Sequence, residues 1–448
     1  MDKQAQVFDT DHLVKTYFSQ ALPLVLSMMV VLVYNLADTF FIAQTGDALL
    51  VAGVSLCAPV FTLLSAFGNI YGQGGSSLIS RLLGSGDDDG VRRVSSFCFY
   101  VAIATGLVLA LAMLLFRNPI LQILGASSDT LPYASAYYTV LAIGAPAQIL
   151  TMIHSNLLRC EGKAGLSMIG TSGGSILNII LDPIFISVLG WGAAGAAIAT
   201  VIGYLASDVF FLIVVLRRSR SLSVDFRRKQ VHGGELRSIL SVGITAAVTN
   251  LATSVTVIVM NQFLLPYGDE KIAALGIVLK VTMVGQLAMV GFAFGGVPLF
   301  GYLYGAGNQK KLKELLRFCT LFLCGLALTM TAILFLAAPL LMGIFLQDAS
   351  IISDGAVMLR WQVAGTAFAA IVLLYTCLFQ ATGKALSALT LSLSRQGVLF
   401  LLVLLVGVLV AGYNGFLAAQ AVADLLSAVL ALVLYRMTLA KPINSIGQ

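Results

Sequence analysis

Long apolar segments recur along the whole chain, and no other feature restricts its fold as much. Each is about 20 residues or longer, enough for a helix to cross the hydrocarbon core of a bilayer. Hydrophobic residues make up 59% of the chain and charged residues 10%, whereas soluble domains carry roughly 25% charged residues. The pattern predicts an all-α integral membrane protein without a soluble domain. Twelve transmembrane helices are expected, at residues 15–43, 49–83, 91–116, 131–158, 164–188, 192–216, 237–265, 272–303, 312–345, 355–380, 385–410 and 414–437.

Basic residues are distributed unevenly among the predicted loops. With the N-terminus in the cytoplasm, one set of loops holds most of them, and the opposite set holds little beyond Arg117 and Lys271, with Arg360 nearby. Because Lys and Arg concentrate in cytoplasmic loops, both termini are predicted to be cytoplasmic. No cleavable signal peptide is expected before the first span. Topology therefore accounts for the net charge of +6, and we expect the lipid bilayer, not nucleic acid, as the partner.

The two halves of the chain resemble each other. The longest polar break, residues 217–237, follows the sixth span, and "LISRLLGSGDDDGVRRV" (78–94) matches "LFGYLYGAGNQKKLKEL" (299–315) at an offset of 221 residues. Each half has an even number of spans, so both halves enter the membrane from the same side, as in a parallel repeat. We therefore predict two six-helix lobes, at residues 1–216 and 237–448, joined by a cytoplasmic linker at 217–236.

Acidic residues deep inside apolar spans are costly and mark candidate functional sites. Two of them have polar neighbours at helical spacing. Asn178 and Asp182 lie four residues apart on one helix face, as do Tyr34 and Asp38. Pro183 cannot donate a backbone hydrogen bond and so frees a carbonyl beside Asp182. A second kink is expected at Pro23 in the first span, and two more deep acids are Asp208 and Asp424.

Two interpretations of these acids are open. A buried Asp can cap a kink or bond a neighbouring helix, or it can bind a cation that drives transport. The repeat favours cation binding, because Val398 and Leu402 occupy the places of Asn178 and Asp182 in the other half. A carboxylate removed from water holds a proton more readily, and the same oxygens could instead bind Na⁺. No cofactor is expected, and no metal apart from Na⁺ at these residues.

Other polar and sulfur-containing residues in the spans are weaker candidates. Lys280 either snorkels outward or meets an acid of the other lobe, and Arg395 is expected to snorkel or to bond carbonyls. His154 is interpreted as a packing histidine with satisfied nitrogens rather than a proton carrier. The glycine-rich "GQGGSS" (72–77) and "GDDDG" (86–90) are interpreted as close helix packing and a solvated turn. The residues expected to line a substrate cavity are Lys280, Met283, Met289, Gln286 and Asn156.

Several of these stretches together resemble the multidrug and toxic compound extrusion (MATE) family over essentially the whole chain. The matching pieces are "YNLADTFFIAQTGD" (34–47), "NLLRCEGKA" (156–164), "LNIILDPIFI" with "GAAGAAIAT" (177–200) and "YGAGNQKK" (304–311). "GGSSLISRLLG" (74–84) is most similar to the bacterial branch that includes the staphylococcal multidrug exporter. The resemblance implies a bacterial plasma (inner) membrane protein whose two lobes face a central cavity and work by alternating access.

The resemblance also implies which residues bind the coupling cation. In relatives with a site in the N-terminal lobe, a Tyr and an Asp of the first helix, an Asn and an Asp of the fifth and a Thr of the sixth cooperate. The branch with a C-terminal site uses a Glu of the seventh helix and an Asp of the tenth; here Glu235 lies only at the start of the seventh span. The implied coupling residues are Tyr34, Asp38, Asn178, Asp182 and Thr200, with helix bends at Pro23 and Pro183.

Two functions of different classes remain after this comparison. The favoured one is an H⁺- or Na⁺-coupled antiporter that exports cationic or amphipathic drugs, acting as a monomer. The alternative is a flippase of a lipid-linked saccharide or another lipid of the same superfamily. A flippase for an anionic headgroup would be expected to line its cavity with bases, and Lys280 is the one deep base in the sequence. An enzyme is not expected, because neither clustered metal ligands nor a triad is evident.

Overall fold

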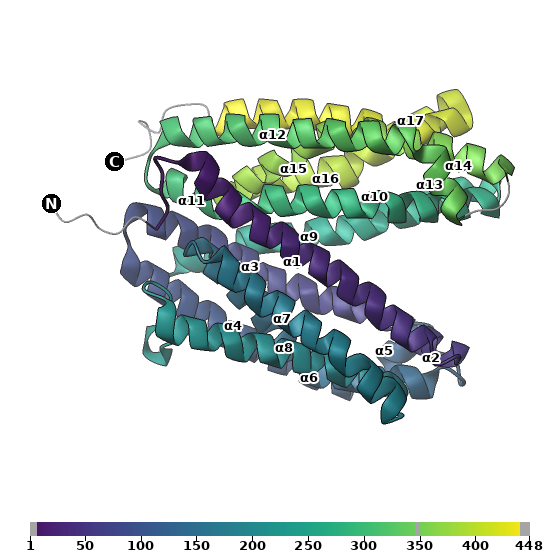
Figure 1. Ribbon diagram of the computed structural model, residues 1–448. Coiled ribbons are helices and arrows are strands. Elements are labelled where there is room, and N and C mark those ends of the chain that lie inside the picture. Colours follow the sequence, from purple (N-terminus) through teal and green to yellow (C-terminus); the bar gives the residue numbers. More distant parts are fainter. Residues whose placement is uncertain (1–6, 346–348, 440–448) are drawn as a thin grey trace. The chain divides into compact units, whose positions relative to one another are not determined.

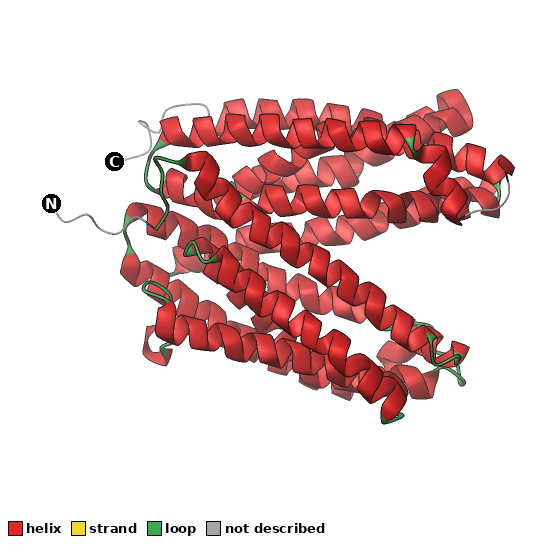
Figure 2. Ribbon diagram, viewed as in Figure 1, coloured by secondary structure: helices red, strands yellow, loops and turns green. Residues whose placement is uncertain are grey.

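A computed structural model describes residues 7–345 and 349–439 of the chain. Within these residues the structure consists of helices and connecting loops and has no strand (Figure 2). Helices form most of their backbone hydrogen bonds inside their own segment, which is what a lipid-embedded chain requires. The predicted cytoplasmic location of the two termini concerns residues 1–6 and 440–448, which lie outside the described residues.

The first half of the chain forms eight α-helices and two short helical turns (Figure 1). Their bounds are α1 Leu13–Ala43, α2 Ala48–Ser55, α3 Ala58–Ser85, α4 Asp88–Leu115, α5 Arg117–Ile123, α6 Leu131–Cys160, α7 Ala164–Pro183, the π-helical turn Ile184–Val188, α8 Gly192–Arg218 and the 3₁₀ turn Phe226–Arg228.

The second half continues the helical pattern. Its elements are α9 Gly233–Leu264, the 3₁₀ turn Leu265–Tyr267, α10 Asp269–Gly295, α11 Val297–Gly305, α12 Gln309–Leu336, α13 Ala338–Phe345, α14 Ala349–Ala364, α15 Thr366–Ala381, α16 Ala385–Gln396 and α17 Val398–Thr438. Inside α17 the backbone leaves helical geometry at Gly412, where φ is 57° and ψ is −129°. Such a positive φ favours glycine.

The candidate membrane spans agree with the predicted fold class. Among the described residues, ten helical stretches are long and apolar enough to cross a membrane, or eleven when the bent pair Ile351–Ala364 and Thr366–Ala381 counts as one span. One of the ten, Ala385–Thr438, contains the break at Gly412 and so covers two of the twelve predicted spans. The prediction of an all-α membrane protein is confirmed, and the twelve-helix repeat is consistent with this count.

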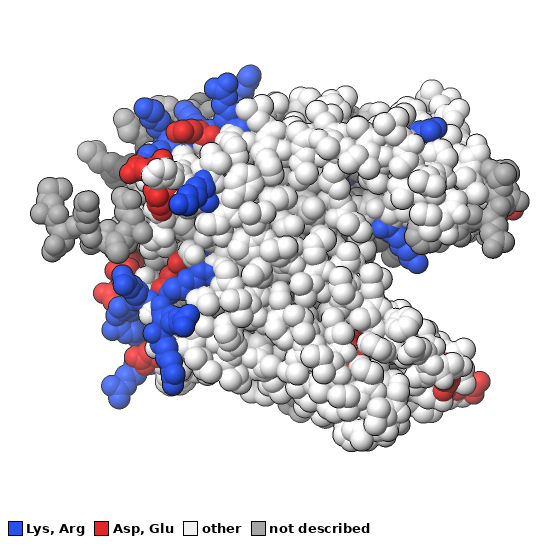
Figure 3. All heavy atoms as spheres, in the orientation of Figure 1, with Lys and Arg blue, Asp and Glu red and all other residues white. Residues whose placement is uncertain are grey.

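The chain folds into two units, each with its own interior. The first consists of Met1–Ile244 with Gly301–Gly307, and the second of Thr245–Phe300 with Asn308–Gln448. Taken by itself, each unit carries most of the basic side chains visible in Figure 3 near one set of helix ends, and the rest of the face in view is largely uncharged. Each unit also has its own buried apolar core. The first unit contains every residue of the predicted coupling site.

Glycines allow close helix crossings inside the first unit. A Cβ built on Gly84 would lie 2.1 Å from the Tyr302 carbonyl oxygen, and a Cβ on Gly305 would lie 2.0 Å from that of Arg81. Gly84 and Gly305 are the two residues that the sequence repeat aligns. In "GQGGSS", Gly74 and Gly75 have similarly close neighbours in Ile239 and Cys98. The glycines of "GQGGSS" and the repeat-related Gly84 and Gly305 therefore serve close helix packing.

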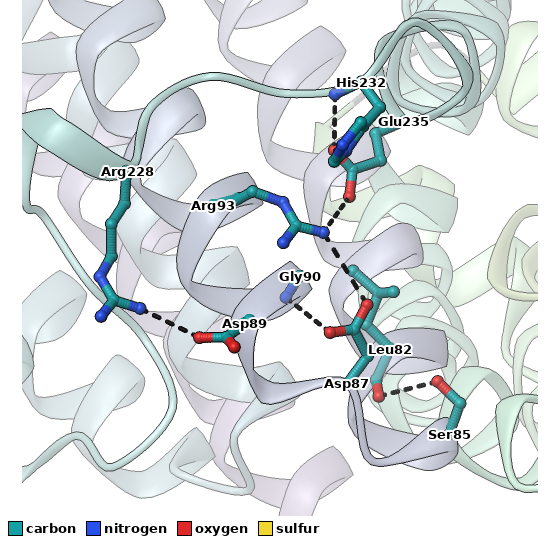
Figure 4. Close-up of polar contacts among 9 residues, drawn as sticks. All are labelled: Leu82, Ser85, Asp87, Asp89, Gly90, Arg93, Arg228, His232 and Glu235. Atoms are coloured by element: carbon teal, nitrogen blue, oxygen red, sulfur yellow. Dashed lines mark hydrogen bonds and ion pairs between the residues drawn. The ribbon is translucent and has the colours of Figure 1, made fainter.

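The "GDDDG" turn connects α3 to α4 through capping and ion pairs (Figure 4). Asp87 is the N-cap of α4 and accepts a hydrogen bond from the Gly90 amide at 2.8 Å. Asp89 pairs with Arg228 at 3.1 Å, and Arg93 pairs with Glu235 at 3.1 Å. Among the described residues no group of three or more His, Cys, Asp or Glu side chains could hold a metal ion. The acids of this turn thus cap a helix and bind bases from the segment after α8.

The predicted linker is attached to the first unit. Buried Glu161, between α6 and α7, accepts hydrogen bonds from the Ser219 hydroxyl at 2.8 Å and from the Arg220 and Ser221 amides at 2.7 and 2.9 Å. Farther along, the Tyr100 hydroxyl donates to the Val224 carbonyl at 2.8 Å. This segment is therefore held along the ends of the first unit's helices rather than extending freely.

Candidate functional site

The site is built where α7 crosses α8. A Cβ on Gly174 would lie 2.4 Å from the Gly203 carbonyl oxygen, and one on Gly203 would lie 2.7 Å from the Gly174 carbonyl oxygen. Helices this close need small residues at their contact. Asn178 follows Gly174 by one turn on α7, and Thr200 precedes Gly203 by about one turn on α8, so the crossing brings the two side chains together.

Asn178 connects the polar side chains of both helices. Its Nδ2 donates to Asp182 Oδ1 at 3.2 Å and to Thr200 Oγ1 at 3.3 Å. Thr200 Oγ1 in turn donates to the Ala196 carbonyl at 3.1 Å. All three side chains are buried, and Asp182 is 0% exposed. The spacing of four residues therefore produces the expected pairing within α7, and the fold adds Thr200.

Unsatisfied oxygen atoms are concentrated at this cluster. Among the described residues, Asp182 Oδ2, Asn178 Oδ1 and Asp38 Oδ1 are buried and have no hydrogen-bond partner. Buried acceptors without a donor cost free energy. Carboxylate and amide oxygens are also the ligand types that hard cations prefer. The donor set therefore fits a proton or a hard monovalent cation.

The first helix contributes the other two predicted residues. Tyr34 is 8% exposed, and its side chain interacts electrostatically with Thr200 and Tyr204 of α8. Asp38, one turn along α1, is half-buried and lies within electrostatic range of Asp182. The structure thus brings all five predicted coupling residues into one region of the first unit.

The helix geometry changes directly behind Asp182. α7 ends at Pro183, and residues Ile184–Val188 continue as a π-helical turn in which the Leu189 amide donates to the Ile184 carbonyl at 2.9 Å. A π-turn widens the helix and accommodates a residue that lacks an N–H group. Pro23, in contrast, lies inside α1, which runs without a break from Leu13 to Ala43 (Figure 1). The bend expected at Pro23 stays a prediction.

Two tyrosines near the site were not predicted. Tyr204 of α8 lies within electrostatic range of Tyr34, and Tyr137 of α6 lies within electrostatic range of Asp38 and Asp182. Tyr204 follows Thr200 by four residues, and this helical spacing could have identified it. Tyr137 comes from a helix distant in sequence and has no such signal, so the tertiary structure was needed to place it.

The residues expected to line a substrate cavity do not form one group. On α10, Lys280, Met283 and Gln286 are exposed at spacings of three residues, whereas Met289 is 5% exposed. Within the described part of the second unit Lys280 has no recorded ion pair. Asn156 of α6 is half-buried, donates to the Met152 carbonyl at 2.7 Å and accepts from Arg159. A cavity shared by these residues stays a prediction.

Two interpretations from the sequence are wrong. Arg395 was expected to snorkel or to bond carbonyls, but its Nε donates to Asp424 Oδ1 at 2.7 Å, because α16 packs against the second part of α17. His154 was expected to have satisfied nitrogens, but neither nitrogen has a partner in the described structure. Its ring lies beside Phe99 and Phe211, with centroid distances of 5.5 and 6.3 Å.

Comparisons with known proteins agree with this architecture. The family model MatE matches residues 23–184 and again residues 245–406. The multidrug export protein MepA of Staphylococcus aureus (strain NCTC 8325 / PS 47) is 31% identical over 433 residues, covering 97% of this chain and 96% of that protein. MepA of Staphylococcus saprophyticus is 30% identical over the same shares.

Solved structures give the same result. A MATE protein crystallised in its bent conformation superimposes with a TM-score of 0.91 at 25% identity, covering 98% of both chains. An outward-facing multidrug resistance MATE family transporter of the MOP superfamily gives 0.89 at 25% identity, again over 98% of both. The two matches of one family model, starting at residues 23 and 245, also confirm the internal repeat. The chain therefore belongs to the MatE family, the multidrug and toxic compound extrusion transporters that its motifs resemble.

Proposed function

We propose that this protein is a cation-coupled antiporter that exports cationic or amphipathic compounds by alternating access. The related MepA proteins are multidrug export proteins, which supports the substrate class. In this proposal the coupling ion, H⁺ or Na⁺, binds in the first unit at Asp38 and Asp182, with Tyr34, Asn178 and Thr200 completing the site. The protein acts as a monomer in the bacterial inner membrane, with both termini in the cytoplasm.

The observation that carries the coupling site is the set of three buried oxygens without a donor, on Asp38, Asn178 and Asp182. The repeat supports a functional interpretation, since the corresponding Val398 and Leu402 are apolar and 66% and 54% exposed. A second copy of the scaffold thus folds without these polar groups. Their burial in the first unit needs another explanation, and binding a cation removes the unsatisfied charge.

Binding of the coupling ion and of a cationic substrate is expected to be mutually exclusive. Both carry positive charge, and both are attracted to the same two carboxylates. An ion that enters down its gradient displaces the substrate on the outer side and leaves on the inner side. The membrane potential contributes about 2.3 kcal/mol per charge per 100 mV, enough to support concentrative export.

The test is ethidium transport by the purified chain in proteoliposomes under separate pH and Na⁺ gradients. We expect Asp182→Asn to reduce gradient-driven transport by at least about ten-fold, because the amide cannot take up a proton or balance the charge of Na⁺. Ethidium binding should weaken, since one of the two carboxylates that attract it is neutralised, but it should stay measurable because Asp38 and the shape of the site are preserved. Asp129→Asn, which neutralises an exposed loop acid, is the matched control. Full gradient-driven transport by Asp182→Asn would show that Asp182 is not a coupling residue.

A further inference from the structure

A third acid of the first unit, Asp208, is buried but has no role in the site described so far. It lies on α8 and is 8% exposed. It follows Thr200 by eight residues, which places it about 12 Å farther along the helix at 1.5 Å per residue. The direction is towards Arg217 and Arg218 at the end of α8, the end that the distribution of basic residues assigns to the cytoplasm.

Polar groups lie between Asp208 and the coupling site. The Thr151 hydroxyl of α6 lies 2.9 Å from Asp208 Oδ1 and 3.3 Å from the backbone carbonyl oxygen of Tyr204. The Tyr204 side chain interacts electrostatically with Tyr34, and Tyr34 interacts with Thr200. Asn178, Thr200 and the two tyrosines therefore lie on the side of Asp182, and Thr151 joins the Tyr204 backbone to Asp208.

The surroundings of Asp208 differ from those of a structural acid. Asp424, in the second unit, is held by Arg395 at 2.7 Å and by Gln420 at 3.1 Å. For Asp208, in contrast, no ion pair with Lys or Arg is recorded in the part of the chain that the structure describes. A buried carboxylate without a base is costly unless it is protonated. The position therefore favours a group that exchanges protons.

The ionisable groups that face this region come from three helices. On α8 itself the neighbour is Tyr204, one turn before Asp208. On α6 it is His154, one turn beyond Thr151. The His154 side chain is 3% exposed, and neither of its nitrogens has a hydrogen-bond partner in the described structure. On α1 it is Tyr34, which reaches Tyr204. From α7 the contact is a backbone carbonyl, that of Gly170, bonded by Ser207 at 2.9 Å.

We propose that Asp208 is the proton-release group between the coupling site and the cytoplasm. This inference rests on the proposed antiport function and specifies the ion as H⁺. When the coupling site discharges, an O–H bond of Asp182 or Asp38 breaks, and water that enters the open site carries the proton past the side chains of Tyr34 and Tyr204. An O–H bond then forms on the Asp208 carboxylate, and this proton finally passes to water at the basic end of α8. Nothing is oxidised or reduced, and one proton leaves for each that entered.

The experiment compares two transport modes in the full-length protein reconstituted in proteoliposomes. Net ethidium transport driven by a pH gradient requires proton release, whereas ethidium exchange between equal concentrations on both sides does not. For Asp208→Asn we expect gradient-driven transport to fall by about ten-fold or more, with exchange and ethidium binding unchanged. Asp208→Glu should restore gradient-driven transport. Asp129→Asn, which makes the same acid-to-amide change at an exposed loop residue, is the matched control.

Each other outcome overturns the inference. Parental gradient-driven transport by Asp208→Asn would exclude a role in proton release, and equal loss of exchange and driven transport would identify a structural role. If Asp208→Asn does not bind ethidium, Thr151→Val is tested in its place. We expect this variant to show slowed gradient-driven transport and normal exchange. Gradient-driven transport at the parental rate would refute the inference. Transport driven by Na⁺ but not by a pH gradient would refute proton release while leaving export intact. Absence of transport by the parent would refute the proposed function itself.

Discussion

At the scale of single residues, Thr200 shows how a small group completes a site. Its hydroxyl accepts from Asn178 at 3.3 Å and donates to the Ala196 carbonyl at 3.1 Å. One oxygen atom thus orients the Asn178 amide on the neighbouring helix. The amide of Asn178 is fixed between Thr200 and Asp182, so its own oxygen stays directed away from both.

Thr200→Val is expected to weaken cation binding without unfolding the protein. Valine has nearly the same shape but leaves one of the two Asn178 amide N–H groups without an acceptor, and one hydrogen bond is worth about 1 kcal/mol. The apparent affinity for the coupling cation should fall by about five-fold, as measured by transport rate against the concentration of that cation. Thr376→Val is the control, because Thr376 is 6% exposed and donates to the Val372 carbonyl at 2.8 Å in the second unit. Equal shifts in both variants would argue against a specific role of Thr200.

At the scale of helices, the crossing of α7 and α8 decides whether the site exists. The two glycines at the crossing let the backbones approach, and the polar residues one turn away then meet. Ser207 strengthens the contact by donating to the carbonyl oxygens of Gly170 and Gly203 at 2.9 and 3.0 Å. The polar side chains do not create the approach; they occupy positions that the small residues make available.

Substitution of neighbouring glycines on α7 tests this interpretation. A Cβ on Gly174 would lie 2.1 Å from Ser207 Oγ and 2.4 Å from the Gly203 carbonyl oxygen, whereas a Cβ on Gly173 would have nothing within 4 Å. Gly174→Ala should therefore lower the free energy of unfolding by about 1–3 kcal/mol through overpacking. Gly173→Ala should preserve or slightly raise it, because Ala favours helix. Thermal unfolding in detergent measures both, and equal stability of the two variants would contradict a tight crossing.

At the scale of the whole molecule, the repeat and the polar segments near its middle organise the chain. Gly84 and Gly305 are equivalent in the repeat, and each fits against the backbone beside the other. Glu161 holds the segment after α8 through the Ser219 hydroxyl and two amides. The basic residues of this segment lie together with those of α4 at the same helix ends (Figure 4).

The predicted topology is tested by labelling single cysteines in intact cells with a membrane-impermeant maleimide. Ser128→Cys, in the loop before α6, should react, and Ser85→Cys, at the end of α3, should react only after permeabilisation. Both serines are exposed, so access depends on the side of the membrane. The native cysteines give a low background, since five are buried and Cys324 is half-buried. Labelling of Ser85→Cys in intact cells would reverse the proposed orientation.

The sequence by itself determined the class of fold, the repeat and the pairing of Asn178 with Asp182 in the candidate site. Segments of apolar residues can be stable in lipid only as helices, because their backbone hydrogen bonds are then satisfied locally. The same local rule places Asn178 beside Asp182, since residues four apart share a helix face. Glycines equivalent in the repeat could also be read from the alignment alone.

Only the tertiary structure decided which helices meet. Thr200 joins Asn178, Tyr137 approaches the two carboxylates, and Arg395 pairs with Asp424 across elements that are distant along the chain. Periodicity within a helix carries no information about its neighbours. The same limit explains His154, whose sequence suggests an ordinary packing residue and whose aromatic surroundings leave both nitrogens without a partner. Contacts between helices depend on where small residues permit close approach, and this is a property of pairs of surfaces rather than of one segment.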